Sequence, residues 1–95
     1  MPQVHPGEIL EEEFLDPLGM TAYQLSKAMC VMPPRVYEIV HGERAVSADT
    51  ALRLGRYFGT GPEFWINLQS HYDLEVARDR TGEKIEREIE PLSPV

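Results

Sequence analysis

The sequence has only one cysteine, three histidines and no long apolar stretch. Cys30 alone cannot form an intramolecular disulfide, and neither it nor any histidine has a second residue at the spacing of a metal site. No apolar run approaches the roughly 20 residues that cross a bilayer, and the N-terminus lacks the charged and apolar regions of a signal peptide. We therefore expect a cytoplasmic protein with no metal, cofactor or membrane partner.

Catalytic motifs are absent as well. The sequence contains no Gly-x-Ser-x-Gly elbow, no phosphate-binding glycine loop and no cysteine-histidine pair of the nucleophilic kind. Glu8 and Glu12 lie one helical turn apart, but carboxylates on a face this acidic are more often solvated than catalytic. These absences predict a protein that acts by binding and is not an enzyme.

Basic residues are outnumbered by 16 acids to nine, which gives a net charge of −7. Such a chain binds DNA only if its basic side chains gather in one region. Residues 1–20 carry five acids and no base, residues 61–95 carry eight acids and four bases, and residues 21–60 carry five bases and three acids. This distribution favours DNA as a partner for the centre and a basic protein for the flanks, although a solvated helix face is the simpler explanation of any one acidic run.

Proline, glycine and capping residues divide the chain into five short helices and leave no convincing strand, which predicts an all-α fold. The first helix begins near Pro6 and is expected to end at Pro17 and Gly19. Two later helices begin with capping boxes, whose side chains bond the free amides of the first turn. These are Thr21-Ala22-Tyr23-Gln24 and Thr60-Gly61-Pro62-Glu63, and the helix between them has Ser47 as its N-cap.

Apolar residues at helical spacing mark the faces that we expect to be buried. The core candidates are Leu10, Phe14, Ala22, Leu25, Ala28, Met29, Val36, Ile39, Val40, Ala51, Leu52, Gly55, Phe58, Trp65, Leu68, Tyr72 and Val76. We place one domain at residues 1–80 and a charged C-terminal tail at residues 81–95. Ile85 and Ile89 fit one face of either a short helix or a strand, and disorder is a third alternative for the tail.

The second and third helices have the lengths and the short connection of a helix-turn-helix. In that motif the second helix enters the major groove, and its first turn faces the base edges. The side of this helix opposite Val36 and Ile39 carries Met32, Pro34, Arg35, Tyr37 and Glu38. Arg35 is the preferred base reader, because a guanidinium donates two hydrogen bonds to guanine O6 and N7, and Glu38 could accept one from cytosine N4.

Phosphate contacts are expected from helix N-termini and from the loops that flank the recognition helix. Thr21 and Gln24 lie at such a terminus, and Lys27 and Arg44 lie near the other edges of the motif. For Arg53 and Arg56, a little further along the chain, pairing with surface acids is the simpler explanation, and for Arg56 it is the one we expect.

Nine blocks of sequence between residues 5 and about 77 carry a resemblance to a known family. They are His5-Pro6-Gly7-Glu8-Ile9-Leu10, Glu13-Phe14-Leu15, Pro17-Leu18-Gly19, Ile39-Val40-His41-Gly42, Arg44-Ala45-Val46, Asp49-Thr50-Ala51-Leu52-Arg53-Leu54, Phe58-Gly59-Thr60, Pro62-Glu63-Phe64-Trp65-Ile66-Asn67-Leu68-Gln69 and Tyr72-Asp73-Leu74. In this order they resemble the HigA family of bacterial antitoxins, also called VapI-like. The resemblance implies a five-helix domain like that of lambda repressor, which forms a homodimer and binds a palindromic operator of double-stranded DNA before its own operon.

The resemblance also implies a complex with a HigB toxin, a basic ribonuclease similar to RelE that cuts messenger RNA on the ribosome. We expect this toxin at the acidic first helix, or at the charged tail. The candidate residues on the helix are Glu11, Glu12 and Glu13. The dimer interface is expected around Trp65, Leu68 and Tyr72.

Two positions depart from the family pattern. Cys30 stands in the turn where glycine is usual, so that a positive φ there would carry an energetic cost. Glu43 stands where a lysine is frequent, which weakens the phosphate contact beside Arg44. Two other functions fit the sequence: a stand-alone helix-turn-helix regulator without a toxin, and a purely protein-binding module.

Overall fold

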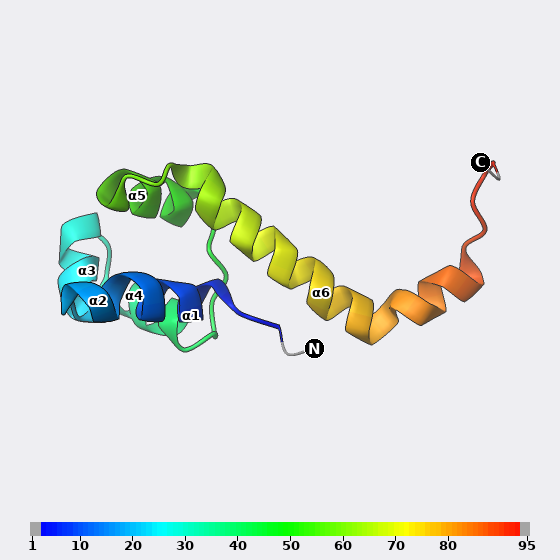
Figure 1. Ribbon diagram of the computed structural model, residues 1–95, viewed down its shortest axis with the longest axis horizontal. Helices are drawn as coiled ribbons and strands as arrows, with labels where there is room; N and C mark the ends of the chain where they lie inside the picture. Colours follow the sequence, from blue (N-terminus) through cyan, green and yellow to red (C-terminus); the bar gives the residue numbers. More distant parts are fainter. Residues whose placement is uncertain (1–2, 94–95) are drawn as a thin grey trace.

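The computed structural model describes residues 3–93, and Figure 1 shows them as a chain of helices. The helical elements, in order, are α1 (Pro6–Ile9), η1 (Leu10–Leu15), α2 (Asp16–Leu18), α3 (Ala22–Met29), α4 (Pro33–Val40), α5 (Ala48–Phe58) and α6 (Pro62–Glu88). The first three follow one another without a break and form one continuous helix. Residues 3–93 contain no strand, so the predicted all-α fold of five helices is confirmed.

The sequence predicted that Pro17 and Gly19 end the first helix; the helix continues through Pro17 and ends at Gly19. Proline has no N–H, and its ring clashes with the carbonyl four residues earlier in a regular α-helix. The wider π-helical turns of η1 come directly before it, and there the amide of Asp16 bonds the carbonyl of Glu11, five residues back. The helix ends at Gly19, whose φ of 62° is the left-handed conformation that glycine adopts without strain.

The caps at the helix starts follow two of the three predictions. Thr21 Oγ1 accepts from the Gln24 amide at 3.0 Å and Gln24 Oε1 accepts from the Thr21 amide at 2.9 Å, so this capping box is confirmed. Ser47 caps α5 as predicted. The box predicted at Thr60 is wrong, because Gly61 is the N-cap of α6 and Thr60 Oγ1 instead accepts a hydrogen bond from the buried indole of Trp65 at 2.9 Å.

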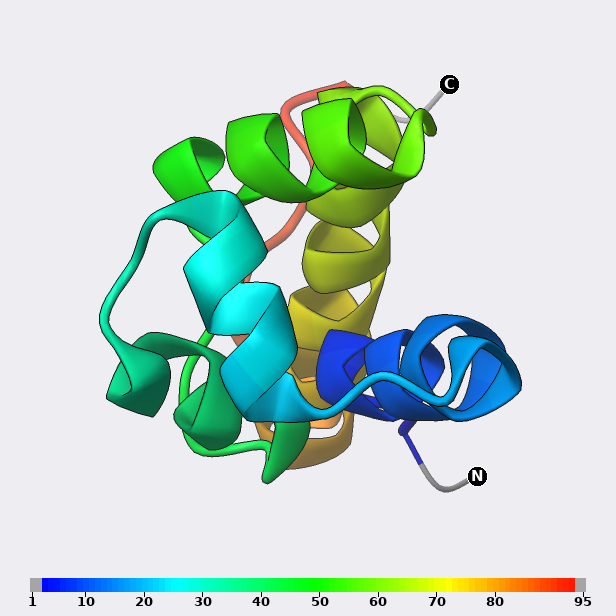
Figure 2. The ribbon, with the colours of Figure 1, turned by 90° about the vertical axis from the view of Figure 1, so that its left-hand side faces the viewer.

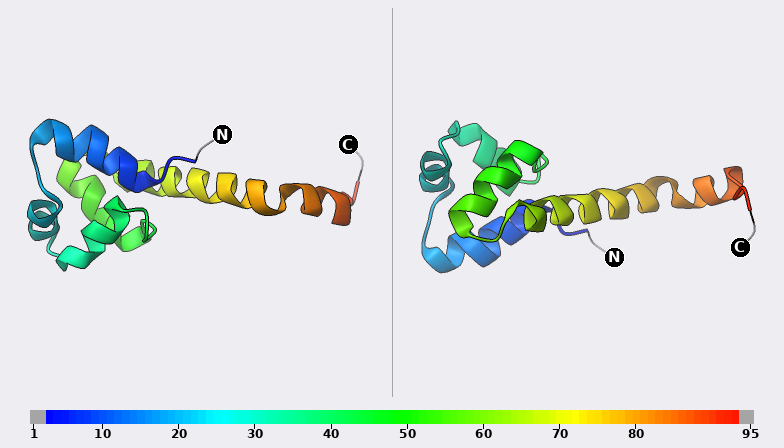
Figure 3. Two further views of the ribbon diagram at one scale, coloured as in Figure 1. Left: turned by 90° about the horizontal axis from the view of Figure 1, so that it is seen from below. Right: turned by 90° about the horizontal axis from the view of Figure 1, so that it is seen from above.

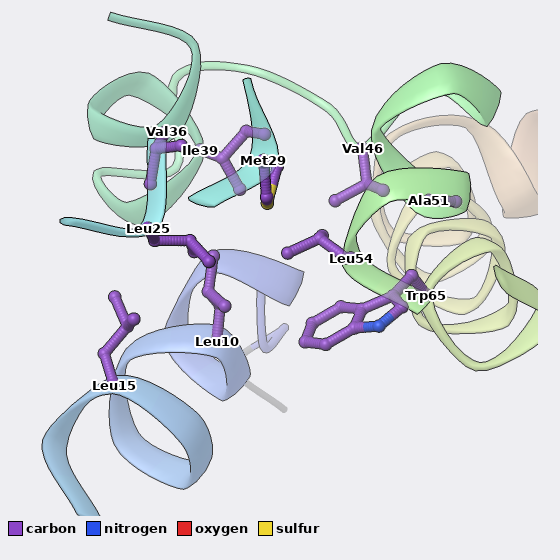
Figure 4. Packing of buried hydrophobic residues seen from close by; sticks show 10 residues of the cluster. All are labelled: Leu10, Leu15, Leu25, Met29, Val36, Ile39, Val46, Ala51, Leu54 and Trp65. Carbon is purple, nitrogen blue, oxygen red and sulfur yellow. The ribbon is translucent and has the colours of Figure 1, made fainter. Parts of the chain in front are cut away.

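Ten apolar side chains form the core between the first helix, α3, α4, α5 and the start of α6. They are Leu10, Leu15, Leu25, Met29, Val36, Ile39, Val46, Ala51, Leu54 and Trp65. Figure 4 shows Leu54 and Trp65 next to each other, on the side of the core that faces Leu10. Two core predictions are wrong: Ala28 is exposed, and Leu52 is 61% exposed while Leu54 is buried in its place. Each of these two residues is adjacent in sequence to a buried one, Met29 or Ala51, and one residue corresponds to a rotation of about 100° around the helix.

Two glycines let neighbouring helices approach closely. A side chain at Gly7 would place its Cβ 1.8 Å from the carbonyl oxygen of Ile39, so α1 packs directly on the backbone at the end of α4. A Cβ at Gly55 would lie 2.4 Å from the carbonyl carbon of Gly61, where the chain turns from α5 into α6. The first of these contacts fixes the position of α4, the predicted recognition helix.

The second half of α6 projects from the body of the molecule. The molecule measures 51 × 22 × 22 Å, and the two views of Figure 3 show α6 extending beyond all other helices. The radius of gyration of the molecule is 16.3 Å, whereas a compact domain of this length has about 12–13 Å. Residues 81–88 belong to this helix, so the boundary predicted at residue 80 falls inside α6, and the helical alternative for Ile85 is the one observed. Ile89 follows the helix in an extended conformation.

Candidate nucleic-acid interface

The turn between α3 and α4 depends on Cys30. Cys30 has φ 58° and ψ 45°, in the left-handed region that favours glycine. Its amide bonds the carbonyl of Lys27 at 3.2 Å, and the amide of Val31 bonds the carbonyl of Ser26 at 3.0 Å. These two bonds form a Schellman motif, which ends α3 and turns the chain towards α4. The sequence-based concern about a positive φ at this position is therefore confirmed.

The outer side of α4 is free, as the helix-turn-helix requires. Val36 and Ile39 are each 1% exposed and hold α4 to the core. Met32 is 76% exposed and Tyr37 is 42% exposed, and Pro34 between them is exposed as well. Figure 2 shows α4 (blue-green) beside α3 (cyan) at the end of the molecule away from the tip of α6. The predicted recognition face is therefore accessible.

Arg35 does not extend freely from this face. Its Nη1 donates to Asp49 Oδ2 at 2.6 Å, across to the first turn of α5. The same carboxylate oxygen accepts from Arg53 Nε at 2.9 Å, and Arg53 Nη1 donates to the carbonyl of Met29 at 2.8 Å. The side-chain hydrogen bonds from Arg53 and Arg35 lower the pKa of Asp49, so it carries its negative charge at neutral pH. Three helices, α3, α4 and α5, thus meet at one carboxylate.

Glu38 pairs with Arg44 in the same way. Glu38 Oε1 accepts a hydrogen bond from Arg44 Nε at 2.8 Å and forms an ion pair with Nη2, also at 2.8 Å. The backbone carbonyl of Glu38 accepts from the amides of Glu43 and Arg44. This arrangement fixes the loop after α4 against the recognition helix. Only Oε1 of Glu38 is paired with Arg44, and the reading of cytosine by Glu38 stays a prediction.

The predicted phosphate-binding residues of α3 lie together on the exposed side of that helix. Thr21 and Gln24 are exposed, and their side chains cap the helix start. Lys27 is exposed, with its Nζ 5.3 Å from the centre of the Tyr23 ring. The α3 helix packs on α4, and the Arg44 loop is held to α4 through Glu38, so both segments with predicted phosphate contacts flank the recognition helix. Asp49 and Arg53 were not predicted there, although their opposite charges four residues apart are a signal for an ion pair.

Of the three predicted dimer residues, one needs correction. Trp65 is fully buried within one chain and cannot contact a second copy. Leu68 and Tyr72 are half-buried and line a depression together with Gln3, Val4 and Ile9. The centres of the Tyr72 and His5 rings are 4.9 Å apart. This part of α6 packs on the N-terminal segment of its own chain. The predicted toxin-binding residues Glu11, Glu12 and Glu13 are exposed.

Within residues 3–93, no group of His, Cys, Asp and Glu side chains is arranged to hold a metal ion. In the same range no helix has both the length and the apolar character needed to span a bilayer.

The capped α3, the left-handed turn and the exposed α4 define a helix-turn-helix DNA-binding protein, and the helix-turn-helix family model matches residues 12–65. The chain belongs to the HigA family of antitoxins, which act by binding and not as enzymes. It is 54% identical to virulence-associated protein I of Dichelobacter nodosus over 81% of this chain and 71% of the relative. It is 37% identical to antitoxin HigA-1 of Vibrio cholerae over 94% and 83% of the two chains.

A solved structure of Pseudomonas aeruginosa antitoxin HigA with the higBA promoter is 49% identical, with a TM-score of 0.94 over 97% of this chain and all of the other. The expected family and five-helix fold are thereby confirmed.

Proposed function

We propose that this protein represses its own operon by binding a palindromic operator as a homodimer, and that it neutralises a basic RelE-like toxin of the HigB type. The observation that supports operator binding is the exposed face of α4, with Met32, Pro34 and Tyr37 turned outward beside Arg35. The similar Pseudomonas aeruginosa HigA was solved with the higBA promoter, which supports the same role for this chain.

In the proposed complex, α4 enters the major groove and the two flanking segments contact the backbone. Arg35 reads a guanine, since two of its donors can reach O6 and N7. Thr21, Gln24 and Lys27 at α3 contact phosphates on one side, and Arg44 contacts them on the other. Glu43, exposed beside Arg44, weakens that second contact through repulsion of phosphate.

The dimer interface in this proposal is the apolar face at the starts of α5 and α6. Leu52 is 61% exposed there and lines a shallow hollow with Ala48, Pro62 and Ile66. We propose that a second copy of the chain covers this face, because one α4 reads only half of a palindrome. The face also lies on α5, the helix that holds Arg35 through Asp49. The two copies of α4 must then lie about 34–36 Å apart, one turn of B-form DNA.

Operator binding is tested with duplex DNA from upstream of the gene, measured over a range of salt concentrations. Arg35→Ala should weaken binding by about 1–3 kcal/mol and relax the preference at one base pair. Arg44→Ala should weaken binding to all sequences and reduce the salt slope by about one. Arg78→Ala is the matched control, since Arg78 is an exposed arginine paired with Glu75 on the projecting part of α6. Wild-type binding that is absent, or flat against salt, would refute operator binding and favour a purely protein-binding module.

The dimer is tested by sedimentation of Leu52→Glu. A charge on this face should shift the protein to monomer and weaken operator binding. Leu74→Glu is the control, because Leu74 is 54% exposed on α6 outside the proposed interface. A dimer that survives Leu52→Glu would place the interface elsewhere.

Toxin binding is proposed at the exposed acids of the first helix, which match a basic surface in charge. Co-expression with the adjacent reading frame should give a stable complex with a small basic protein. Reversing Glu11, Glu12 and Glu13 to Lys should weaken that complex, whereas the same reversal at Glu83, Glu86 and Glu88 of α6 is the control. Intact binding after the first reversal, with loss after the second, would assign the toxin to α6. No complex at all would favour a stand-alone regulator.

A further inference from the structure

Asp49 occupies an unusual position for an acid in a protein that binds DNA. It lies in the first turn of α5, is exposed, and its carboxylate reaches Arg35 of the recognition helix, where a negative charge repels phosphate. Its side chain is nevertheless shared by two arginines, with Oδ2 2.6 Å from Arg35 Nη1 and 2.9 Å from Arg53 Nε. Its charge is thus directed at the residue proposed to read a base.

The geometry of Arg35 leaves donors for a second partner. A guanidinium has five N–H donors on three nitrogens, and Asp49 uses one of those on Nη1. Among residues 3–93 the Arg35 side chain makes no other hydrogen bond, so Nε, Nη2 and one N–H of Nη1 remain available. Two donors on neighbouring nitrogens are enough for guanine O6 and N7. Asp49 therefore restrains the guanidinium without occupying all of the edge needed for a base.

Asp49 is itself held in place. Arg53 follows it by one helical turn, and its Nη1 donates to the carbonyls of Met29 and Cys30 at the end of α3, at 2.8 and 3.4 Å. The chain of contacts therefore runs from the backbone of the helix-turn-helix through Arg53 and Asp49 to Arg35. An arginine fixed before binding has less side-chain freedom to lose when it meets its base, and fewer wrong orientations to sample.

We propose that Asp49 is a positioning residue for base recognition: it orients the Arg35 guanidinium towards guanine, and Arg53 in turn orients Asp49. This inference rests on the proposed reading of DNA by α4. It predicts that removal of the carboxylate damages the discrimination between bases more than it damages affinity, because the loss of one negative charge also reduces repulsion of phosphate.

The experiment selects binding sequences from duplexes randomised over about 20 base pairs, two turns of B-form DNA. The proteins compared are the wild type, Arg35→Ala, Asp49→Ala, Asp49→Asn and the double variant Arg35→Ala with Asp49→Ala. Glu75→Ala is the matched control, since it also removes one carboxylate paired with an arginine, midway along α6. Thermal unfolding verifies that each variant is folded.

We expect Arg35→Ala to abolish a preference of about 5- to 150-fold for one base in each half-site. Asp49→Ala should reduce the same preference at least about fivefold and leave the other positions unchanged. The preference of Asp49→Asn should fall between those of the wild type and Asp49→Ala, because its amide oxygen still accepts a hydrogen bond but has no charge. In the double variant Asp49→Ala should have no further effect on that preference, since it acts through Arg35.

Four results would overturn the inference, each in a different way. If Asp49→Ala raises affinity for every sequence and leaves the base preference unchanged, Asp49 only holds Arg35 away from DNA. If Asp49→Ala lowers all preferences equally, its role is structural. If Arg35→Ala leaves the profile unchanged, the assignment of Arg35 as base reader fails and takes the inference with it. If the wild type enriches no sequence, the proposed operator binding itself fails.

Discussion

The left-handed Cys30 gives a quantitative test of how the turn of the helix-turn-helix is built. A non-glycine residue in this conformation costs about 1–2 kcal/mol, because Cβ approaches the following carbonyl. Glycine removes that cost, but it also increases the conformational entropy of the unfolded chain, which lowers the stability by about 0.4–1 kcal/mol. Cys30 is exposed, so its side chain contributes little packing that the substitution would lose. We therefore expect Cys30→Gly to stabilise the protein by about 0.5–1 kcal/mol.

The assay is thermal unfolding under reducing conditions, at a fixed protein concentration because a dimer unfolds at a temperature that depends on it. For a domain of this size the expected gain corresponds to a rise in Tm of about 2–8 °C. Cys30→Ala is the control, because alanine removes the thiol and keeps the left-handed strain, and its Tm should stay close to that of the wild type. A fall in Tm for Cys30→Gly, or an equal rise for both variants, would refute strain at Cys30.

Three further predictions concern stability. Burial lowers the pKa of His5 from its ordinary 6.5, and His5 Nδ1 accepts from the Gly7 amide at 2.9 Å, so the fold binds the neutral ring. This contribution is complete above about pH 6.5 and is lost as the pH falls through the lowered pKa. Lowering the pH from 7 to 5 should therefore reduce the free energy of unfolding, measured in urea, more for the wild type than for His5→Asn. Gly7→Ala should lower the free energy of unfolding by about 2–3 kcal/mol, since its methyl group would overlap the Ile39 carbonyl. Gly82→Ala, in the open part of α6, should raise it by about 0.5–1 kcal/mol. Equal effects of the two substitutions would contradict this packing. Gln69→Leu should cost about 1–3 kcal/mol in urea unfolding, because Gln69 Oε1 accepts from the buried Val46 amide at 2.8 Å, and an unchanged midpoint would show that water replaces it.

Local signals predicted the helices well where neighbours within one turn decide the outcome. The Thr21 capping box and the Ser47 cap both involve residues three apart in the chain. The same reasoning failed at Thr60, although Trp65 lies only five residues away in the chain. The Trp65 ring is fully enclosed by the core, so its N–H needs an acceptor, and the Thr60 hydroxyl accepts from it and does not cap the helix. Tertiary packing thus outweighed a local capping pattern at that position.

The site shows the same division. The outward face of α4 followed from its helical period, because Val36 and Ile39 must turn inward and their opposite side must then turn out. The partner of Arg35 did not follow, since Asp49 lies 14 residues away and meets it only through the angle at which α5 packs beside α4. Trp65 was assigned to the correct stripe of α6 but to the wrong contact, because periodicity gives the apolar face and not the surface that covers it.

The sequence by itself determined that this protein is all-α, that its second and third helices form a helix-turn-helix, and that it resembles HigA. These features depend on caps, glycines and apolar spacing that act over a few residues. Only the tertiary structure decided that Asp49 holds Arg35, that Glu38 holds Arg44, and that α6 continues past residue 80 as a projecting helix. Ion pairs between helices depend on the distance and direction of packed backbones, which no short stretch of sequence specifies.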